Sequence, residues 1–323
     1  MKYRQLTRNI QVSVLGFGGA ALSGKEGGYG FGDVDEEVGY SLIDNARRLG
    51  INVFDSAPIY GFGQSERRIG QYLRANPQAR KEMVLVTKGG ITWNEQRYAR
   101  IDNSPEVLKR SIDQSLADLH TDVIDVYMIH WPDPNVRLDE SLTVIENARS
   151  DGRVRAVGVS NFSVELLKRA REICPIEVVQ GDFSVFNASN SELIQYCSEN
   201  AIGFMAYGTL AKGMLAGTAK AGRHYDDKDH RSYDHHMVAR LDKLRAIQGR
   251  YLGIVEKIGV SPSALALAWA GRKPGVSTLL CGAKSQKQQS ELIDGVSFVV
   301  PDAIVRALDE MSREATPLYY EKA

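Results

Sequence analysis

Short apolar segments alternate with longer amphipathic segments along most of the chain, and this alternation constrains the fold more than any other feature. Most of eight such apolar segments are continuous, which is the pattern of strands that are covered on both faces. Strands that alternate with helices predict a parallel sheet, and eight is the number that closes into a (β/α)8 barrel. An open, doubly wound sheet is the alternative. The predicted strands are Val14–Gly18, Asn52–Asp55, Met83–Lys88, Val123–His130, Val154–Ser160, Glu177–Gln180, Gly203–Tyr207 and Ser277–Gly282.

The segments between these strands carry the signals that begin and end helices. Ser104-Pro105 and Ser261-Pro262 each place an N-cap residue before a proline in the first helical position. A helix that begins at Asp33 or Asp35 is expected to end at Leu49, because Gly50 follows it. The other predicted helices are Leu138–Arg149, Val164–Ile173, Ser191–Asn200, Asp242–Ile258 and Gln286–Asp294.

Two segments depart from the alternation. Lys2–Val14 precedes the first strand and predicts a β-hairpin that turns at residues 7–9. Gly217–Arg240 follows the seventh strand as a long polar loop, and it contains four of the six histidines of the chain. Loops of this length are usually functional or disordered, and we expect this one to be solvated or to cover a bound cofactor. A metal site that uses His230, His235 and His236 is the alternative, but we expect no metal.

The composition is that of an ordinary globular chain. The sequence has 323 residues, of which 43% are hydrophobic and 25% are charged, and we expect residues 1–323 to form a single domain. Because its 40 basic and 40 acidic side chains cancel, the chain offers no bulk attraction to nucleic acid or to an anionic membrane.

Location is predicted from what the sequence lacks and from its cysteines. No apolar run reaches the ~18 residues of a transmembrane helix, and Met1–Ser13 lacks the apolar core of a signal peptide. The three cysteines lie far apart, and none belongs to a C-x-x-C spacing. We therefore expect Cys174, Cys197 and Cys281 to be reduced thiols in a cytoplasmic protein.

Ionisable residues stand at the carboxyl ends of three consecutive predicted strands. Asp55, Lys88 and His130 end the second, third and fourth strands, and Tyr60 follows Asp55 by five residues. In a parallel barrel these ends converge on the face that holds the active site. Taken alone, each residue has an ordinary structural explanation: a turn cap, a solvated lysine, a core histidine or an aromatic plug.

The combination of these residues favours chemistry. A lysine among apolar neighbours needs a carboxylate partner, and Asp55 is placed to supply one. An ammonium beside Tyr60 favours the phenolate and lowers the pKa of the tyrosine from its usual value of ~10. Tyr60 would then be a proton donor, and His130 could hold a carbonyl oxygen in line with it. A hydride donor would complete the reaction.

Three long motifs carry a family resemblance. They are Phe54–Gly61 (FDSAPIYG) with the following Gly63–Glu66 (GQSE), Asp125–Asp133 (DVYMIHWPD) and Gly152–Phe162 (GRVRAVGVSNF). With these motifs the chain resembles the aldo-keto reductases over nearly its whole length, and it looks most similar to the bacterial general stress protein-like branch. The resemblance implies a (β/α)8 barrel with an N-terminal hairpin. It also implies a catalytic tetrad of Asp55, Tyr60, Lys88 and His130, with Tyr60 as general acid.

The resemblance also implies a nicotinamide dinucleotide cofactor, usually NADP, bound extended. This agrees with the sequence, in which no G-x-G-x-x-G motif follows a strand. By resemblance, Ser160, Asn161 and Gln180 hold the nicotinamide carboxamide, and Tyr207 stacks on the nicotinamide ring. The implied phosphate contacts are Thr209, Leu210, Lys212 and Gly213 for the diphosphate, and Gly282, Ala283, Lys284, Ser285 and Gln288 for the adenosine phosphate at a helix N-terminus.

Some positions depart from the family pattern. Many relatives have Ser-Pro-Leu where this chain has Gly208-Thr209-Leu210, and Gln288 and Leu292 stand where arginine and asparagine are frequent. The departures weaken the case for a 2'-phosphate, but NADP is favoured and NAD is the alternative.

The predicted function is carbonyl–alcohol interconversion on a small aldehyde, ketone or sugar-like molecule. The candidate pocket walls are Tyr29, Phe31, Trp93 and Trp131. Two other functions are alternatives. One is a barrel retained as a redox-sensing subunit of another protein, and the other is an unrelated barrel hydrolase that uses Asp55 and Glu66.

Overall fold

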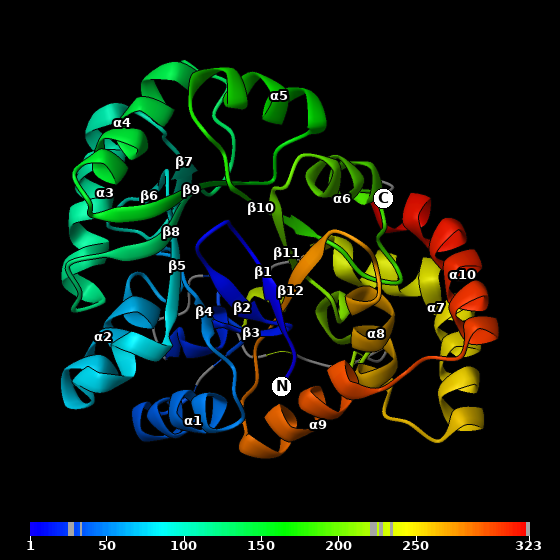
Figure 1. Ribbon diagram of the computed structural model, residues 1–323. Helices are drawn as coiled ribbons and strands as arrows, with labels where there is room; N and C mark the ends of the chain where they lie inside the picture. The colour runs from blue at the N-terminus through cyan, green and yellow to red at the C-terminus, as the bar shows by residue number, and fades with distance from the viewer. Residues whose placement is uncertain (25–28, 33, 220–224, 226–228, 233–234, 321–323) are drawn as a thin grey trace.

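A closed barrel of eight parallel strands forms the centre of the computed structural model, and helices surround it as an outer layer (Figure 1). The structure describes residues 1–24, 29–32, 34–219, 225, 229–232 and 235–320. Around the barrel the strands follow their order in the chain, so the predicted parallel barrel is confirmed and the open sheet is wrong. The strands are β3 (Leu15–Gly18), β4 (Val53–Asp55), β5 (Val84–Gly89), β8 (Ile124–Ile129), β9 (Val154–Ser160), β10 (Val178–Asp182), β11 (Gly203–Tyr207) and β12 (Val276–Cys281).

The helices begin largely where the sequence signals place them. Ser163, Ser261 and Ser285 are N-caps whose side chains accept a hydrogen bond from the backbone N–H three residues later. The helices are α1 (Glu36–Arg48), α2 (Gln64–Ala75), α3 (Pro105–Asp118), α4 (Leu138–Ser150), α5 (Val164–Ile173), α6 (Ser191–Glu199), α7 (His235–Ile258), α8 (Pro262–Gly271), α9 (Gln286–Ser297) and α10 (Asp302–Tyr320).

Four features differ from the sequence prediction. Helices α2 and α10 were not predicted, nor was the small antiparallel pair β6 (Ile91–Trp93) and β7 (Ala99–Ile101) that follows β5. Helix α7 begins at His235, so the end of the predicted loop Gly217–Arg240 is helical. Within that loop His224 lies outside the described residues. Among the residues that are described, no group of three His, Cys, Asp or Glu side chains could hold a metal ion.

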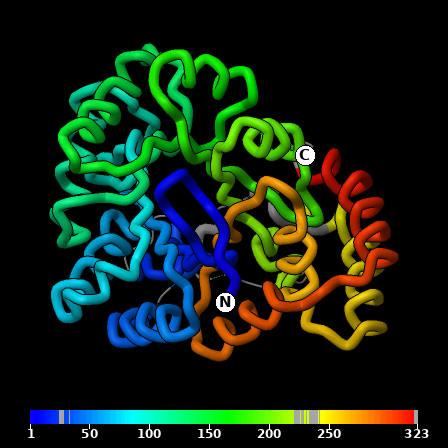
Figure 2. Tube along the Cα trace, viewed as in Figure 1, coloured from blue at the N-terminus to red at the C-terminus, as the bar shows by residue number. Residues whose placement is uncertain are grey.

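The last helix, α10, lies along the outside of the barrel beside α7 (Figure 2). Arg240 Nε of α7 donates to the Tyr319 carbonyl oxygen of α10 at 2.9 Å. Over the described part of the chain, no single helix is long and apolar enough to cross a membrane. The segments Asp242–Ile258 and Pro262–Gly271 are long and apolar enough only when they are counted together, and the chain bends by 98° between them.

The predicted N-terminal hairpin is confirmed and closes the amino end of the barrel. Strands β1 (Tyr3–Gln5) and β2 (Gln11–Ser13) pair antiparallel, with Tyr3 opposite Ser13. Leu6, Ile10 and Val12 are buried in one cluster with apolar side chains from the barrel interior. Two hydrogen bonds of Asn52, to Ser13 N–H at 2.7 Å and to the Gln11 carbonyl at 3.0 Å, tie the hairpin to the barrel.

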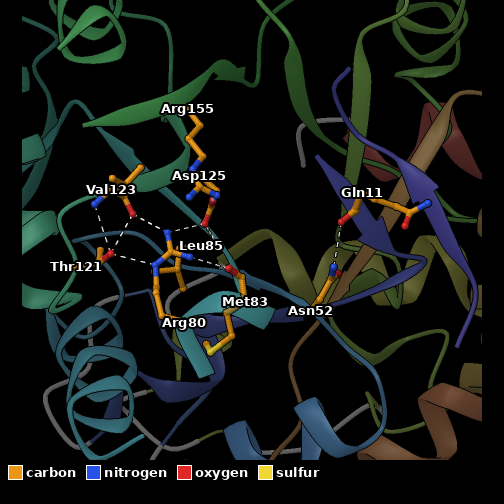
Figure 3. A network of polar contacts seen from close by, with 9 residues as sticks. All are labelled: Gln11, Asn52, Arg80, Met83, Leu85, Thr121, Val123, Asp125 and Arg155. Atoms are coloured by element: carbon orange, nitrogen blue, oxygen red, sulfur yellow. Dashed lines mark hydrogen bonds and ion pairs between the residues drawn. The ribbon is translucent and has the colours of Figure 1, made fainter. Parts of the chain in front are cut away.

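A polar network occupies the rim beside this hairpin (Figure 3). Arg80, in the 3-10 segment Pro77–Glu82, donates to Thr121 Oγ1 and to the carbonyl oxygens of Met83 and Val123 at 2.7–3.0 Å. Its guanidinium also lies 2.8 Å from the buried carboxylate of Asp125, which accepts from Leu85 N–H as well. The network joins the starts of β5 and β8 and borders an open cavity of about 560 Å³. Contacts at this end of a barrel generally serve stability.

The alternation of side chains along the strands brings the site together. Side chains at i and i+2 face the same side of a strand. Val53, Val86, Met128, Val178 and Met205 fill the barrel interior. The residues two positions further on are Asp55, Lys88, His130, Gln180 and Tyr207, so these side chains form the next interior layer, at the carboxyl ends of the strands.

Candidate active site

A buried ion pair lies at the centre of this layer. Lys88 is fully buried, and its Nζ lies 2.8 Å from Asp55 Oδ1 and 2.8 Å from the Ser56 carbonyl oxygen, to both of which it donates. Gln180 Nε2 donates to the same Asp55 oxygen at 2.8 Å. Burial disfavours the ammonium, but the Asp55 carboxylate and Tyr60 more than offset this, and the pKa of Lys88 is raised. The site therefore keeps a positive charge at neutral pH.

Tyr60 lies beside this cation, in the loop between β4 and α2. The Lys88 Nζ is 5.3 Å from the centre of the Tyr60 ring. Desolvation raises the pKa of Tyr60, and the charge of Lys88 and a hydrogen bond with it act in the opposite direction. The sequence correctly predicted the sign of the lysine effect. It was wrong about the net direction, because loss of solvent around the hydroxyl outweighs the lysine.

His130 completes the group of four. Its ring meets the Tyr60 ring edge to face, with centroids 6.0 Å apart and an angle of 87°. Burial, with a smaller effect from Lys88, holds the pKa of His130 well below its usual value of 6.5. The imidazole is therefore neutral at pH 7 and can donate an N–H to an oxygen without carrying charge. The four residues thus bring together the hydroxyl proton of Tyr60, the cation of Lys88, which is paired with Asp55, and the neutral N–H donor of His130.

Ser160, Asn161 and Tyr207 form a second polar cluster at the same end of the barrel. Asn161 Nδ2 donates to the His130 carbonyl oxygen at 2.9 Å and to Ser160 Oγ at 3.0 Å. The Tyr207 hydroxyl donates to Asn161 Oδ1 at 2.6 Å. Asn161 has a positive φ of 62°, which aims its short amide back towards the strand ends. Two of the three predicted carboxamide-binding residues, Ser160 and Asn161, are thus joined by their side chains, with the partly buried Tyr207 ring beside them. The third, Gln180, accepts from Asn161 N–H through its carbonyl oxygen, but its side-chain amide donates to Asp55.

The predicted diphosphate segment follows β11. Thr209 Oγ1 lies 3.1 Å from Cys281 Sγ at the end of β12, so the two strand ends are in contact. Ala211, Lys212 and Gly213 have consecutive positive φ values of 46°, 54° and 98°. Successive peptide groups in turns of this kind can form an anion-binding concavity.

The predicted adenosine-phosphate segment lies at the start of α9. Ser285 is the N-cap and accepts from Gln288 N–H, while Gln288 Oε1 accepts from Lys284 N–H at 2.7 Å. This reciprocal pair resembles a capping box, which satisfies free N–H groups at a helix start. The Gln288 side chain is therefore turned back onto the backbone, although the sequence placed it among the phosphate contacts. Gly282 and Ala283 lead into this turn.

An acidic residue lies opposite this helix start. The Lys284 ammonium and the Asp229 carboxylate both lie against Gly32, within 3.0 and 3.5 Å of where its Cβ would be. Asp229 is buried and pairs with Arg231 through two hydrogen bonds of 2.6 and 2.8 Å. Burial raises the pKa of Asp229, but the combined effect of Arg231 and Lys284 is larger. The pKa of Asp229 is therefore below its usual value.

The predicted aromatic walls lie around the mouth of the barrel. Phe31 forms a β-bridge with Asp229, and Arg231 stacks over the Phe31 ring at 5.4 Å. Trp93 packs against Phe62, with ring centres 5.3 Å apart. Tyr29, Trp93 and Trp131 are all exposed large side chains.

Sequence reasoning missed three residues of this region and misjudged a fourth. It did not single out Phe62, Asp229 or Arg231 for the site. Phe62 packs against Trp93, and Asp229 and Arg231 contact Phe31, and no local spacing signals contacts between segments so far apart in the chain. It offered Glu66 as a possible partner of Asp55 in a hydrolase. The structure places Glu66 elsewhere, fully buried behind β5 with its Oε1 accepting from Thr87 Oγ1 at 2.7 Å.

Comparisons with known proteins agree with this geometry. The model of the Aldo/keto reductase family matches residues 14–313. Aldo-keto reductase YhdN of Bacillus subtilis is 32% identical over 305 residues, which are 90% of this chain and 88% of that protein. The NADH-specific methylglyoxal reductase of Escherichia coli is 28% identical over 95% of this chain and 96% of that protein.

A solved structure extends the likeness to three dimensions. The glycerol dehydrogenase AKR11B4 of Gluconobacter oxydans has a TM-score of 0.84 and 29% identity, and the match covers 98% of this chain and 96% of that one. The family model covers all eight strands of the barrel and all four residues of the group formed by Asp55, Tyr60, Lys88 and His130. The chain belongs to the aldo-keto reductase family, and it is an oxidoreductase that acts on carbonyl compounds.

Proposed function

We propose that this chain is an NADP-dependent reductase that interconverts the carbonyl group of an aldehyde, ketone or sugar-like molecule with the corresponding alcohol. One observation carries the proposal: the buried pair of Lys88 and Asp55 lies next to the Tyr60 hydroxyl, with a neutral His130 beside it. When bound, the nicotinamide cofactor supplies or accepts the hydride. The names of two relatives, a methylglyoxal reductase and a glycerol dehydrogenase, support short, oxygen-rich substrates.

Tyr60 acts as general acid and base in this proposal. It holds a proton on its hydroxyl and delivers it to the carbonyl oxygen during reduction, and it takes the proton back during oxidation. Lys88 makes the hydroxyl a stronger acid, since its positive charge stabilises the phenolate that forms. Asp55 keeps the Lys88 ammonium in place, and His130 orients the oxygen by donating a hydrogen bond.

The residues at the strand ends fit a nicotinamide dinucleotide. Ser160, Asn161 and Gln180 offer the amide and hydroxyl groups that a carboxamide requires, and the half-exposed Tyr207 ring offers a face for stacking. The other contacts we propose are Thr209, Leu210, Lys212 and Gly213 for the diphosphate, and Gly282, Ala283, Lys284, Ser285 and Gln288 for the adenosine phosphate.

The choice between NADP and NAD depends on the start of α9. Lys284 and the helix N-terminus favour a 2'-phosphate there, whereas the capping role of Gln288 and the nearby carboxylate of Asp229 oppose it. The printed names of relatives include an NADH-specific enzyme and the enzyme yakc [NADP(+)] of Schizosaccharomyces pombe, which is 27% identical over 94% of this chain and 89% of that protein. We favour NADP, with NAD as the alternative.

We also propose a place for the chain within its family and in the cell. Its 32% identity with YhdN of Bacillus subtilis supports the bacterial general stress protein-like branch. The three cysteines are buried free thiols, which supports a cytoplasmic location.

The test is a panel of carbonyl compounds, including methylglyoxal and glyceraldehyde, assayed by oxidation of NADPH and of NADH. We expect oxidation of the reduced cofactor that depends on the carbonyl compound. At low cofactor concentration this oxidation should be faster with NADPH than with NADH, and cofactor fluorescence should show tight binding of NADPH. Binding without turnover of any carbonyl would point instead to a redox-sensing barrel. Absence of dinucleotide binding would contradict the proposal.

A further inference from the structure

A carboxylic acid is buried behind the strand that carries Lys88. Glu66, in the first turn of α2, is fully buried, and its Oε1 accepts from Thr87 Oγ1 at 2.7 Å. Thr87 and Lys88 are neighbours on β5, so their side chains leave the strand on opposite faces. Lys88 points into the barrel towards Asp55, and Thr87 points outward towards the helices. Glu66 is thus linked to the back of the segment whose front holds the reacting groups.

Other buried polar groups surround this carboxyl group. Glu66 Oε2, Ser115 Oγ and the Tyr127 hydroxyl are all buried. The Ser115 hydroxyl of α3 forms a hydrogen bond with the Glu66 carboxyl group, and the Tyr127 hydroxyl lies behind Gly89, where a Cβ would come within 2.2 Å of it. Because buried polar groups need partners, this cluster favours one fixed arrangement of α2 and α3 behind β5.

Burial and the neighbouring charges together place the protonation change of Glu66 near neutral pH. Burial raises the pKa of Glu66 to about 7, against the effects of the hydrogen bonds with Thr87 and Ser115. Of the charged groups that face it, Asp118 of α3 raises this pKa further and Lys88 of β5 lowers it. Tyr127 of β8 stays neutral, because burial raises its own pKa beyond the usual range.

We propose that Glu66 is a positioning residue that holds the end of β5, and with it Lys88, through its contact with Thr87. The inference rests on the role proposed above for Lys88 and Tyr60. Glu66 reaches no substrate or cofactor, since the strand lies between it and the barrel interior. The Thr87 hydrogen bond fixes the position of this end of β5 relative to α2. It therefore also fixes where the Lys88 ammonium lies relative to Asp55 and Tyr60.

The protonation state of Glu66 also affects how readily Tyr60 gives up its proton. As the neutral acid, Glu66 leaves the field of Lys88 on Tyr60 unchanged. As the carboxylate, it adds a negative charge to that of Asp55 and weakens the stabilisation of the Tyr60 phenolate. Tyr60 then becomes a weaker proton donor, so the rate of carbonyl reduction should fall as the pH rises through the neutral range.

Two variants separate the hydrogen bond from the charge. Glu66→Gln keeps an oxygen that can accept from Thr87 but cannot ionise, so the fall of kcat near neutral pH should disappear while KM stays the same. Thr87→Val removes the hydrogen bond and keeps the acid. It should lower kcat by about two- to tenfold without changing KM, and move the fall of kcat to higher pH.

The control is Glu192→Gln, which neutralises an exposed glutamate in the first turn of α6. Its pH profile should overlay that of the wild type. The proposal is overturned if Glu66→Gln keeps the wild-type fall of kcat, or if Thr87→Val matches the wild type in kcat and in pH profile. Failure of the underlying function looks different: the wild type itself would not reduce carbonyls, or Lys88→Met would be as active as the wild type.

Discussion

At the scale of single residues, the site depends on one cation that no solvent reaches. The Lys88 ammonium is balanced by Asp55 and by the Ser56 carbonyl oxygen, and the side chain is fully buried. Breaking a buried pair by removing one partner typically costs ~3–5 kcal/mol. Stability and activity should therefore both respond when this side chain is changed.

We expect Lys88→Met to abolish activity near neutral pH and to lower the free energy of unfolding. Without the ammonium the Tyr60 hydroxyl becomes a still weaker acid, and the Asp55 carboxylate keeps the 2.8 Å hydrogen bond from Gln180 but loses its cationic partner. The pH–rate profile and urea unfolding measure the two effects. If the profile of the variant overlays that of the wild type, Lys88 has no part in proton transfer.

The ionisation of Glu66 leads to a separate prediction about how stability depends on pH. Its pKa is raised by burial from 4.5 to about 7, so between these pH values the folded protein binds a proton that the unfolded chain has released. This contribution to stability is complete below pH 4.5 and is lost as the pH rises through about 7. Relative to Glu66→Gln, the free energy of unfolding of the wild type should fall by about 3 kcal/mol across this range. Parallel curves for the two proteins would contradict the shift.

Residue chemistry was partly predictable from sequence. Asp55, Lys88 and His130 could be found because each ends a strand, and the period of two carries all of them into the same layer. The burial of Glu66 could not be found, since it depends on α2 packing against β5. The direction of the Tyr60 shift was also out of reach, because desolvation is a property of the whole fold.

At the scale of elements, we propose that the start of α9 decides between NADP and NAD. Lys284→Ala should weaken NADPH binding about ten- to a hundredfold, the worth of one charged hydrogen bond of ~1.5–3 kcal/mol, and should leave NADH binding nearly unchanged. The NADPH effect should shrink as salt is added. Titration of both cofactors by fluorescence is the measurement. Equal weakening of NADH and NADPH would show that Lys284 holds a group common to both.

The polar network at the base of the barrel should serve stability alone. Arg80→Met removes the hydrogen bonds to Thr121, Met83 and Val123 and the contact with Asp125, whose partner Arg155 stays at 2.6 Å. We expect the free energy of unfolding to fall by about 2–4 kcal/mol, with kcat and KM unchanged. A large drop in kcat without loss of stability would mean that the two ends of the barrel are coupled.

Each element that sequence reasoning missed lacks a clear sequence signal. The N-cap residue of helix α2 is a glycine, Gly63, in the left-handed conformation with φ 88°, so no side-chain cap marks the start of the helix. Helix α10 contains Pro317, which argues against a helix. The pair β6 and β7 spans only three residues per strand, mostly exposed. Elements with clear caps, such as α3 after Ser104 and α8 after Ser261, were placed to within a residue of their observed starts.

At the scale of the whole molecule, the barrel separates stability from chemistry. The hairpin and the Arg80 network occupy the amino end, and the ionisable layer occupies the carboxyl end. We propose that residues 1–323 form one domain, because the apolar interior that continues from Leu6 to Met205 supports both ends. The residues that we propose to react come from segments far apart in sequence, and closure of the barrel brings them together.

Replacement of the Tyr60 hydroxyl tests the central claim most directly. Tyr60→Phe removes the proposed proton donor and keeps the ring beside His130 and Lys88. Loss of a general acid typically costs ~10²–10⁴ in rate. We therefore expect kcat for carbonyl reduction to fall by about that factor, while the Kd for NADPH, measured by fluorescence, stays within about twofold of the wild type. A Tyr60→Phe variant that keeps near-wild-type kcat would contradict the account.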